Sequence, residues 1–490
     1  MPGLAVAALM AMAGGARAAD ADPPTHPCRI EGMPNELQCG QLRRPLDPAR
    51  PAGTQIEIHY MIVPAMARNK QPDPVLLLAG GPGQSAIDIA PLVLPRLARL
   101  NNRRDLVFID QRGTGRSAPL QCADESRLPI KEALDPAAQF ARMKQCALDL
   151  ARLPHGDLRF YTTTIAMQDF EAVRQRLGVP QWNLVGASYG TRAALEYQRQ
   201  FPHQVRRTVM DGVAPPDMAL PASFSTDSQA ALDEVFASCE QDREGCARRY
   251  PALRRDWAAL LAGLPREVTV QHPLSGEPER FTLRRELLMS AVRVPLYAPA
   301  LAAGLPAAIT AAAAGRYEGL FGLANTLGGS GKAMKLAAGM HFSVICAEDL
   351  PRLEAAGDRP GADFAEQYRE QYRRSCRDWP RGEVAPDFYT IPPAQTPVLL
   401  LSGGADPATP PRHGERVAKA LGARAQHIVV PQAGHGVLSI ACMRDVLFRF
   451  IDAKSDAAAL PQDAACATRI PRPPAFQPVQ PGASSSRASS

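Results

Sequence analysis

A serine between two glycines, in Gly-Ala-Ser-Tyr-Gly at residues 186–190, is in a setting that could support covalent chemistry. It follows the apolar run 182–185 and precedes a stretch with helical spacing. A serine on a sharp strand-to-helix turn has a strained backbone, and flanking glycines remove the Cβ atoms that would clash there. The amide of Tyr189 would then lie at a helix N-terminus, where it could stabilise an oxyanion. We expect Ser188 to be a nucleophile; the alternative is a structural turn.

A serine hydroxyl is too weakly acidic to attack an acyl carbon unaided, so a histidine base and an orienting carboxylate are needed. In folds with this turn, the order along the chain is Ser, then the acid, then His. Asp406 follows a buried strand in a tight turn, and His435 lies between glycines just beyond the last strand. Ligands bind at this edge of open α/β sheets. We therefore predict a triad of Ser188, Asp406 and His435.

Other residues compete for these two roles. Asp211 also ends an apolar run and could be the acid; otherwise it is a turn residue that hydrogen-bonds its own backbone. Four further histidines lack a loop flanked by glycines, and we interpret them as ordinary strand, helix, surface or core residues. They are His203, His341, His413 and His427.

Gly-Gly-Pro-Gly at residues 80–83 directly follows another apolar run. An oxyanion hole needs two donors, one after the nucleophile and one from the loop after an early strand. Glycine lets the amide of Gly81 approach the oxyanion without a side chain in the way, and Pro82 stiffens the turn. We expect Gly81 and Tyr189 to form the oxyanion hole; the alternative for residues 80–83 is a plain turn.

The elements that would position these residues alternate between strands and helices. Residues 55–64 alternate apolar and polar side chains, as a half-buried strand does, and residues 164–177 have helical spacing. Continuous apolar runs are typical of parallel strands that are buried on both faces. We predict an α/β fold with a mostly parallel central sheet. The continuous runs are residues 75–79, 106–110, 182–186, 205–211, 396–402 and 426–430.

The pattern changes after residue 215. Residues 216–340 are rich in Ala, Leu and Arg with helical spacing, so we predict a mainly helical cap inserted into the sheet domain. The two parts of that domain would be residues 20–215 and 341–469. The Pro- and Ser-rich end, residues 470–490, is typical of a disordered tail.

Residues 1–19 form a short apolar run that ends in small residues, with a cleavage site after Ala18 or Ala19. The positive start of a secretory signal is missing, so an Ala-rich disordered start is the alternative. No later stretch reaches the roughly 18 apolar residues of a membrane span. We expect a signal peptide over residues 1–19, export to the periplasm or medium, and no integral membrane segment after signal removal.

Ten cysteines agree with export, because an oxidising compartment favours an even number. Connectivity does not follow from the sequence, but short loops close most easily, so we expect neighbours to pair. The alternative is buried free thiols in a cytosolic enzyme. The expected pairs are Cys28 with Cys39, Cys122 with Cys146, Cys239 with Cys246, Cys346 with Cys376, and Cys442 with Cys466.

Several function classes find no support. The net charge of +6 comes from 55 basic and 49 acidic residues scattered along the chain, so we expect no nucleic-acid partner. Neither Cys-x-x-Cys nor His-Glu-x-x-His occurs, and we expect no metal and no cofactor. Residues 328–332, Gly-Gly-Ser-Gly-Lys, lack the first glycine of a P-loop and are followed by Ala333 where Ser or Thr must hold magnesium. We interpret them as a flexible turn of the cap.

With these motifs in order, the sequence resembles the α/β-hydrolase serine exopeptidases of the proline iminopeptidase and tripeptidyl aminopeptidase group. The resemblance covers roughly residues 55–215 and 340–466 and leaves the cap unassigned. It rests on five motifs, of which the first two are the most specific. The five motifs are residues 80–83, 110–117 (Asp-Gln-Arg-Gly-Thr-Gly-Arg-Ser), 186–190, 404–407 and 434–436.

The resemblance implies cleavage of one or a few residues from the free N-terminus of peptide substrates, with the ammonium held by acidic side chains near the cap. Proline iminopeptidases commonly carry His where Ala79 stands, so the chain looks more like the exported tripeptidyl branch, with residues 341–469 as its C-terminal segment. Glu348 and Asp349 are the candidate anchor; the alternative is a solvated acidic pair beside a disulfide. Two other hypotheses are a carboxylic-ester hydrolase with the same triad and a non-catalytic binding protein on this fold.

Overall fold

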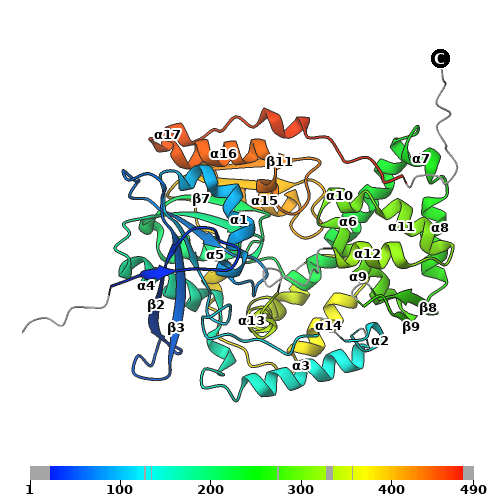
Figure 1. Cartoon of the computed structure of the whole chain (residues 1–490), viewed down its shortest axis with the longest axis horizontal. Coiled ribbons are helices and arrows are strands. Elements are labelled where there is room, and N and C mark those ends of the chain that lie inside the picture. The colour runs from blue at the N-terminus through cyan, green and yellow to red at the C-terminus, as the bar shows by residue number, and fades with distance from the viewer. Residues whose placement is uncertain are drawn as a thin grey trace, which may run out of the picture.

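A computed structural model of the protein describes residues 23–477 except 126–127, 134, 273–274, 327–334 and 356 (Figure 1). The expected signal peptide over residues 1–19, the turn at 328–332 and the tail beyond residue 477 lie outside the described residues.

The core of the described chain is a nine-stranded sheet in the order β1-β2-β3-β5-β4-β6-β7-β10-β11. The pairs from β1 to β5 are antiparallel, and every pair from β5 to β11 is parallel. The predicted α/β class with a mostly parallel sheet is confirmed. The strands are β1 (His26–Cys28), β2 (Leu37–Pro45), β3 (Gln55–Val63), β4 (Val75–Leu78), β5 (Leu106–Ile109), β6 (Trp182–Ala187), β7 (Val205–Asp211), β10 (Val398–Gly403) and β11 (Ala425–Val430).

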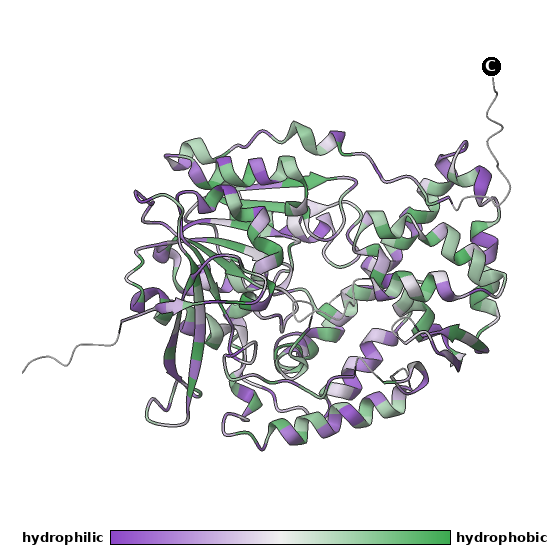
Figure 2. Ribbon diagram, viewed as in Figure 1, coloured by the Kyte–Doolittle hydropathy of each residue, from purple (hydrophilic) through white to green (hydrophobic). Residues whose placement is uncertain are grey.

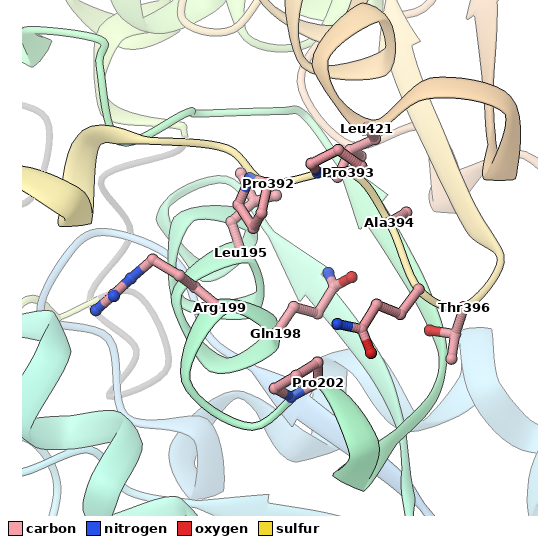
Figure 3. Close-up of a pocket in the computed structure, with 10 residues that line it drawn as sticks. Leu195, Gln198, Arg199, Pro202, Pro392, Pro393, Ala394, Thr396 and Leu421 are labelled. Carbon is pink, nitrogen blue, oxygen red and sulfur yellow. The ribbon is translucent and has the colours of Figure 1, made fainter.

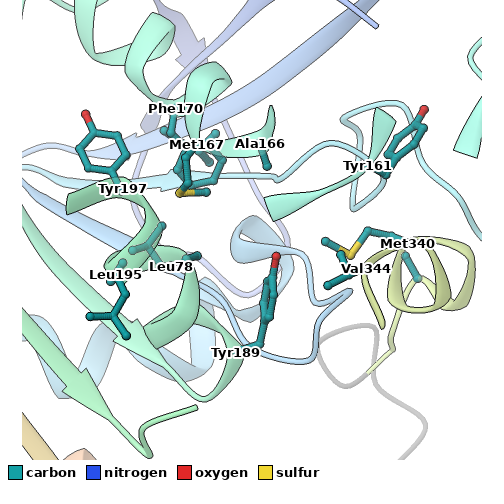
Figure 4. Close-up of a cluster of buried hydrophobic side chains, with 14 of the residues drawn as sticks. Leu78, Tyr161, Ala166, Met167, Phe170, Tyr189, Leu195, Tyr197, Met340 and Val344 are labelled. Atoms are coloured by element: carbon teal, nitrogen blue, oxygen red, sulfur yellow. The ribbon is translucent and has the colours of Figure 1, made fainter. Parts of the chain in front are cut away.

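Helices cover both faces of this sheet, which is why its central strands are continuous apolar runs. Successive strand residues point to opposite faces: Leu76 packs into one hydrophobic core and Leu77 into the other. Figure 4 shows part of the first core. It is covered by α4 (Thr163–Arg176), α5 (Tyr189–Gln200) and α15 (Pro411–Leu421), and the second core is covered by α1 (Ala86–Asn101) and α16 (Ala441–Asp452).

Between β7 and β10 the chain forms a cap of helices with its own hydrophobic core, beside the sheet domain (Figure 1). Apolar and polar residues alternate along the cap helices (Figure 2), and the buried apolar ones form this core. The expected cap was mainly helical; the structure adds a two-stranded sheet. The elements are α6 (Leu220–Gln241), α7 (Cys246–Arg249), α8 (Leu253–Ala262), β8 (Arg266–Gln271), β9 (Pro278–Leu283), α9 (Arg285–Leu296), α10 (Pro299–Ala302), α11 (Leu305–Ala313) and α12 (Glu318–Asn325).

Two further helical segments connect the cap to the sheet domain. The return from the cap consists of α13 (Ala338–Val344) and one turn of π-helix, Ile345–Asp349, and is followed by α14 (Gln367–Cys376). The remaining α-helices of the described residues are α2 (Ile130–Ala133), α3 (Pro136–Leu150) and α17 (Asp456–Ala459).

Residues 470–477, where we expected a disordered tail to begin, lie against the cap. The amide of Phe476 donates to the Ala303 carbonyl at 2.8 Å, and the Tyr250 hydroxyl donates to the Phe476 carbonyl at 2.5 Å. Arg472 pairs with Glu234 at 2.8 Å. The proline-rich residues 470–477 are therefore an extended segment that contacts with the cap hold in place.

All ten cysteines form disulfides, and each joins the neighbours in sequence that we expected to pair. Two of these bonds hold the cap and its return: Cys239–Cys246 and Cys346–Cys376. Within the described residues, every helix is too short or too polar to cross a membrane.

Candidate active site

Ser188 occupies a strained turn between β6 and α5. Its φ is +55° and its ψ is −123°, a conformation that a residue with a Cβ rarely adopts. The neighbouring glycines are sterically required: a Cβ on Gly190 would lie 2.0 Å from the Leu78 carbonyl oxygen, and one on Gly186 would lie 2.5 Å from the Gly190 oxygen. The Ser188 amide donates to the Asp211 carbonyl at 2.9 Å. The turn therefore holds the half-buried serine above the end of β6.

Asp406 and His435 come together at the same edge of the sheet. They follow β10 and β11, neighbouring parallel strands whose last residues, Gly403 and Val430, are paired in register. His435 Nδ1 lies 2.8 Å from Asp406 Oδ2. The His435 side chain is 18% exposed, whereas that of Asp406 is fully buried. Asp406 can thus hold the Nδ1–H tautomer and leave Nε2 free to act as a base.

The Asp406 carboxylate is fixed by its own turn. Oδ1 accepts from the amides of Ala408 and Thr409 at 2.8 and 3.0 Å, and Oδ2 accepts from the Thr409 hydroxyl at 2.8 Å. The Thr409 hydroxyl also lies 3.1 Å from His435 Nδ1. Sequence reasoning missed Thr409, although a threonine three residues after a turn carboxylate is a recognisable partner for it.

The two partners shift each other's pKa. Burial acts to raise the pKa of Asp406, but the charge and hydrogen bond of His435 and the amides of Thr409 and Ala408 together outweigh it, so the pKa is lowered. Burial acts to lower the pKa of His435, but the charge and hydrogen bond of Asp406 and the charge of Asp211 together outweigh it, so that pKa is raised. The pair therefore favours a carboxylate beside an imidazole of raised pKa, which suits general-base chemistry.

Asp211, the rival acid, has a different position. Its carboxylate accepts from the amides of Val437 and Leu438 at 2.8 and 2.9 Å. It thereby anchors the loop that follows His435. The histidine's hydrogen-bonded carboxylate is that of Asp406.

Residues 80–83 lie directly beside the Ser188 turn. A Cβ on Gly80 would lie 3.3 Å from Ser188 Cβ, and one on Gly81 would lie 2.7 Å from the Gly83 amide nitrogen. Gly81 has a φ of +108°, which glycine adopts freely. Within the described part of the chain its amide donates to no acceptor. Tyr189 is the first residue of α5, so its amide lies at the N-terminus of that helix.

The return from the cap supports this loop. The Gly83 carbonyl accepts from the Ala337 amide at 2.9 Å, and His341 Nδ1 lies 3.1 Å from the Pro82 oxygen. His341 Nε2 lies 2.8 Å from the Tyr372 hydroxyl. Burial lowers the pKa of His341, which favours the neutral ring. We had interpreted His341 as an ordinary residue; it braces the expected oxyanion loop from α13.

The Asp-Gln-Arg-Gly motif that follows β5 braces the same region. Asp110 accepts from the Ser85 hydroxyl at 2.7 Å, and burial raises its pKa to about 6. Gln111 Nε2 donates to the Tyr189 hydroxyl at 3.0 Å. The motif therefore connects the start of α1 to the start of α5, which directly follows the candidate nucleophile.

The structure places the two residues of the expected ammonium anchor out of reach of a substrate. Glu348 and Asp349 are each 1% exposed. Asp349 pairs with both terminal nitrogens of Arg192 at 2.9 Å, and Glu348 accepts from the Thr163 amide at 2.7 Å. Burial raises the pKa of Glu348 to about 7. These carboxylates therefore connect the cap's return to α4 and α5, and they are not available to a substrate ammonium.

The cap contacts the candidate triad through the segment after α9. The His435 amide donates to the Tyr297 carbonyl at 2.9 Å, and the two rings meet edge to face with centroids 5.2 Å apart. The Tyr297 hydroxyl accepts from Arg293 Nη2 at 2.7 Å. Sequence reasoning missed both residues, because helical spacing in the cap does not reveal which residues face the sheet domain.

The pocket drawn in Figure 3 is separate from this site. It is lined by the second half of α5 and by residues 392–396, which precede β10. Ser188 stands at the start of α5 and Asp406 follows β10, so the pocket lies at the opposite edge of the sheet.

Two family models match the chain: alpha/beta hydrolase fold over residues 73–300 and TAP-like protein over residues 362–476. The tripeptidyl aminopeptidase of Streptomyces coelicolor is 32% identical over 41% of this chain and 40% of that protein. Serine protease Hip1 of Mycobacterium tuberculosis is 29% identical over 39% of each chain. Carboxylesterase B of the same species is 28% identical over 43% of this chain and 42% of that protein.

This chain thus spans about two fifths of the length of the curated relatives that it matches. Among solved structures, an alpha/beta hydrolase enzyme from a deep-sea metagenome library aligns with 82% of this chain and 96% of its own, at 17% identity and a TM-score of 0.37.

The sheet topology and the first family match assign the α/β-hydrolase fold to the chain, as the sequence predicted. Within that fold, the second match and the relatives support the TAP-like branch, which the sequence also indicated.

Proposed function

We propose that this protein is a serine peptidase that removes single residues or short peptides from the free N-terminus of peptides. Ser188, Asp406 and His435 are the proposed triad, with Gly81 and Tyr189 as the oxyanion hole. The observation that carries the proposal is the strained Ser188 turn at the same sheet edge as the Asp406–His435 pair, 2.8 Å apart.

In the proposed mechanism, Ser188 Oγ attacks the scissile carbonyl while His435 Nε2 accepts its proton. Asp406 holds the opposite ring nitrogen and stabilises the imidazolium. The amides of Gly81 and Tyr189 donate to the oxyanion. His435 then protonates the leaving amine, and an acyl group stays on Ser188. Water, deprotonated by His435, releases the acyl group and restores the serine.

The direction of cleavage is supported by the relatives named tripeptidyl aminopeptidase, and the peptide substrate also by the serine protease. With Glu348 and Asp349 buried, the group that binds the ammonium is unassigned. The five disulfides support export, because such bonds persist in oxidising compartments.

The alternative is hydrolysis of carboxylic esters by the same triad. The relative named carboxylesterase B favours it, and the proposed acyl transfer would proceed equally on an ester.

The deciding experiment compares a peptide 4-nitroanilide with a free N-terminus, its N-acetylated counterpart and a short acyl ester. We expect cleavage of the free peptide and little of the acetylated one. Equal rates on both would contradict the aminopeptidase proposal, and activity confined to the ester would favour the alternative. Ser188→Ala should abolish turnover; full activity in this variant would exclude the mechanism.

A further inference from the structure

Arg293, on α9, is a cation without a carboxylate partner in the described part of the chain. Its Nε donates to Ser228 Oγ at 3.0 Å and its Nη2 to the Tyr297 hydroxyl at 2.7 Å. Two further rings flank the guanidinium: Cζ lies 4.3 Å from the centroid of Phe224 and 5.5 Å from that of Tyr368. Arg293 Nη1 has no acceptor among the described residues.

Removing a guanidinium from water costs free energy, which is normally offset by an acid or by several acceptors. Asp349 offsets this cost for Arg192, and three main-chain carbonyls offset it for Arg207. Arg293 has only aromatic faces and two hydroxyls, which offset the cost in part. The side chain is half-buried, so it also retains access from outside. This combination leaves a positive charge and a free N–H available to a ligand.

One aromatic ring separates this charge from the proposed general base. Arg293 Cζ lies 5.1 Å from the centroid of Tyr297, and that ring is 5.2 Å from the ring of His435. The charge of Arg293 is among those that lower the pKa of His435. A peptide residue spans at most about 3.6 Å. A group bound to Arg293 would therefore lie within roughly three residues of the scissile bond.

We propose that Arg293 binds a carboxylate of the substrate close to the scissile bond. This inference rests on the proposed peptidase function. A guanidinium matches a carboxylate in charge and geometry, and the bond is charge-assisted. The carboxylate has two possible sources: the C-terminus of a short peptide or an Asp or Glu side chain. The same charge repels a substrate ammonium, so the free N-terminus must lie away from Arg293.

Matched peptides test the proposal on the wild-type protein. The C-terminal arm compares Ala-Ala-Ala-Ala with its C-terminal amide. The side-chain arms compare Ala-Ala-Ala-Asp-amide with the Asn peptide, and Ala-Ala-Glu-4-nitroanilide with the Gln one. In at least one arm, the carboxylate substrate should have a kcat/KM about tenfold higher or more, which is the size of one charge-assisted hydrogen bond. The arm that shows the preference identifies the source.

Variants then assign the preference to this residue. Arg293→Met should reduce the carboxylate-to-neutral ratio to near one, and Arg293→Lys should keep part of it. Arg255→Met, an exposed position on α8, is the matched control and should keep the full ratio. Thermal unfolding of each variant shows whether it folds; the wild-type ratios test the proposal even where a variant does not.

The outcomes separate this inference from the proposed function. Cleavage of the neutral peptides without any preference would overturn the carboxylate site and leave the peptidase proposal standing. Arg293→Met lowering both members of a pair equally would make Arg293 a structural support and would also overturn it. No cleavage of any peptide would remove the peptidase proposal, and the carboxylate site with it.

Discussion

At the scale of single residues, Asp406 is the most constrained member of the proposed triad. It accepts hydrogen bonds from two amides, one hydroxyl and the His435 ring. Asp406→Asn should lower kcat by roughly 10³–10⁴, because the amide favours the wrong imidazole tautomer. Asp211→Asn is the control: it loosens the loop after His435 and should cost no more than about tenfold. Equal losses in the two variants, measured on the same 4-nitroanilide, would contradict the assignment of the acid.

The pH dependence follows from His435. As the proposed base it must be neutral, so kcat/KM should fall as the pH drops through its pKa. Burial acts to lower this pKa, but Asp406 raises it above its usual value near 6.5. The acidic limb of the wild-type profile should therefore lie above pH 6.5, and the limb of residual Asp406→Asn activity should lie at lower pH. A limb that is unchanged in the variant would show that another group controls it.

At the scale of elements, the loop of residues 80–83 depends on a backbone that only glycine adopts freely. Gly81→Ala adds a Cβ 2.7 Å from the Gly83 nitrogen at a φ of +108°. The loop must shift, and kcat should fall by about 10²–10³ as one oxyanion donor is displaced. Gly178→Ala is the matched control, because its φ is also positive, at +65°, but no atom lies within 4 Å of the added Cβ. It should leave kcat unchanged; a similar loss in both would indicate general destabilisation.

The element scale also explains which features the sequence could reveal. Strands such as β4 and β10 were predictable because burial on both faces leaves continuous apolar runs. Ser188, Asp406 and His435 could be proposed as a triad from the sequence because they follow such runs. Arg293 was not, since helical periodicity in the cap does not reveal the neighbours of each face. The partner of Asp349 is Arg192, 157 residues away along the chain, and no local pattern signals such a distant ion pair.

At the scale of the whole molecule, the site depends on how the cap and its return meet the sheet domain. His341 on the return, and Ala337 just before it, contact the loop of residues 80–83, and the Cys346–Cys376 disulfide ties the return to α14. A crosslink restricts the unfolded chain more when it closes a longer loop. This bond spans 30 residues, whereas Cys239–Cys246 in the cap spans 7.

We therefore expect replacement of both cysteines of a disulfide by alanine to change stability and activity differently for these two bonds. Loss of Cys346–Cys376 should lower the free energy of unfolding by about 3–4 kcal/mol, and loss of Cys239–Cys246 by about 2 kcal/mol. Guanidinium unfolding followed by tryptophan fluorescence measures both. Only the first variant should also lower kcat under native conditions, because of the two bonds only Cys346–Cys376 fixes the return that contacts the proposed oxyanion loop. A larger loss of kcat in the second variant would mean that the cap, and not its return, positions the loop.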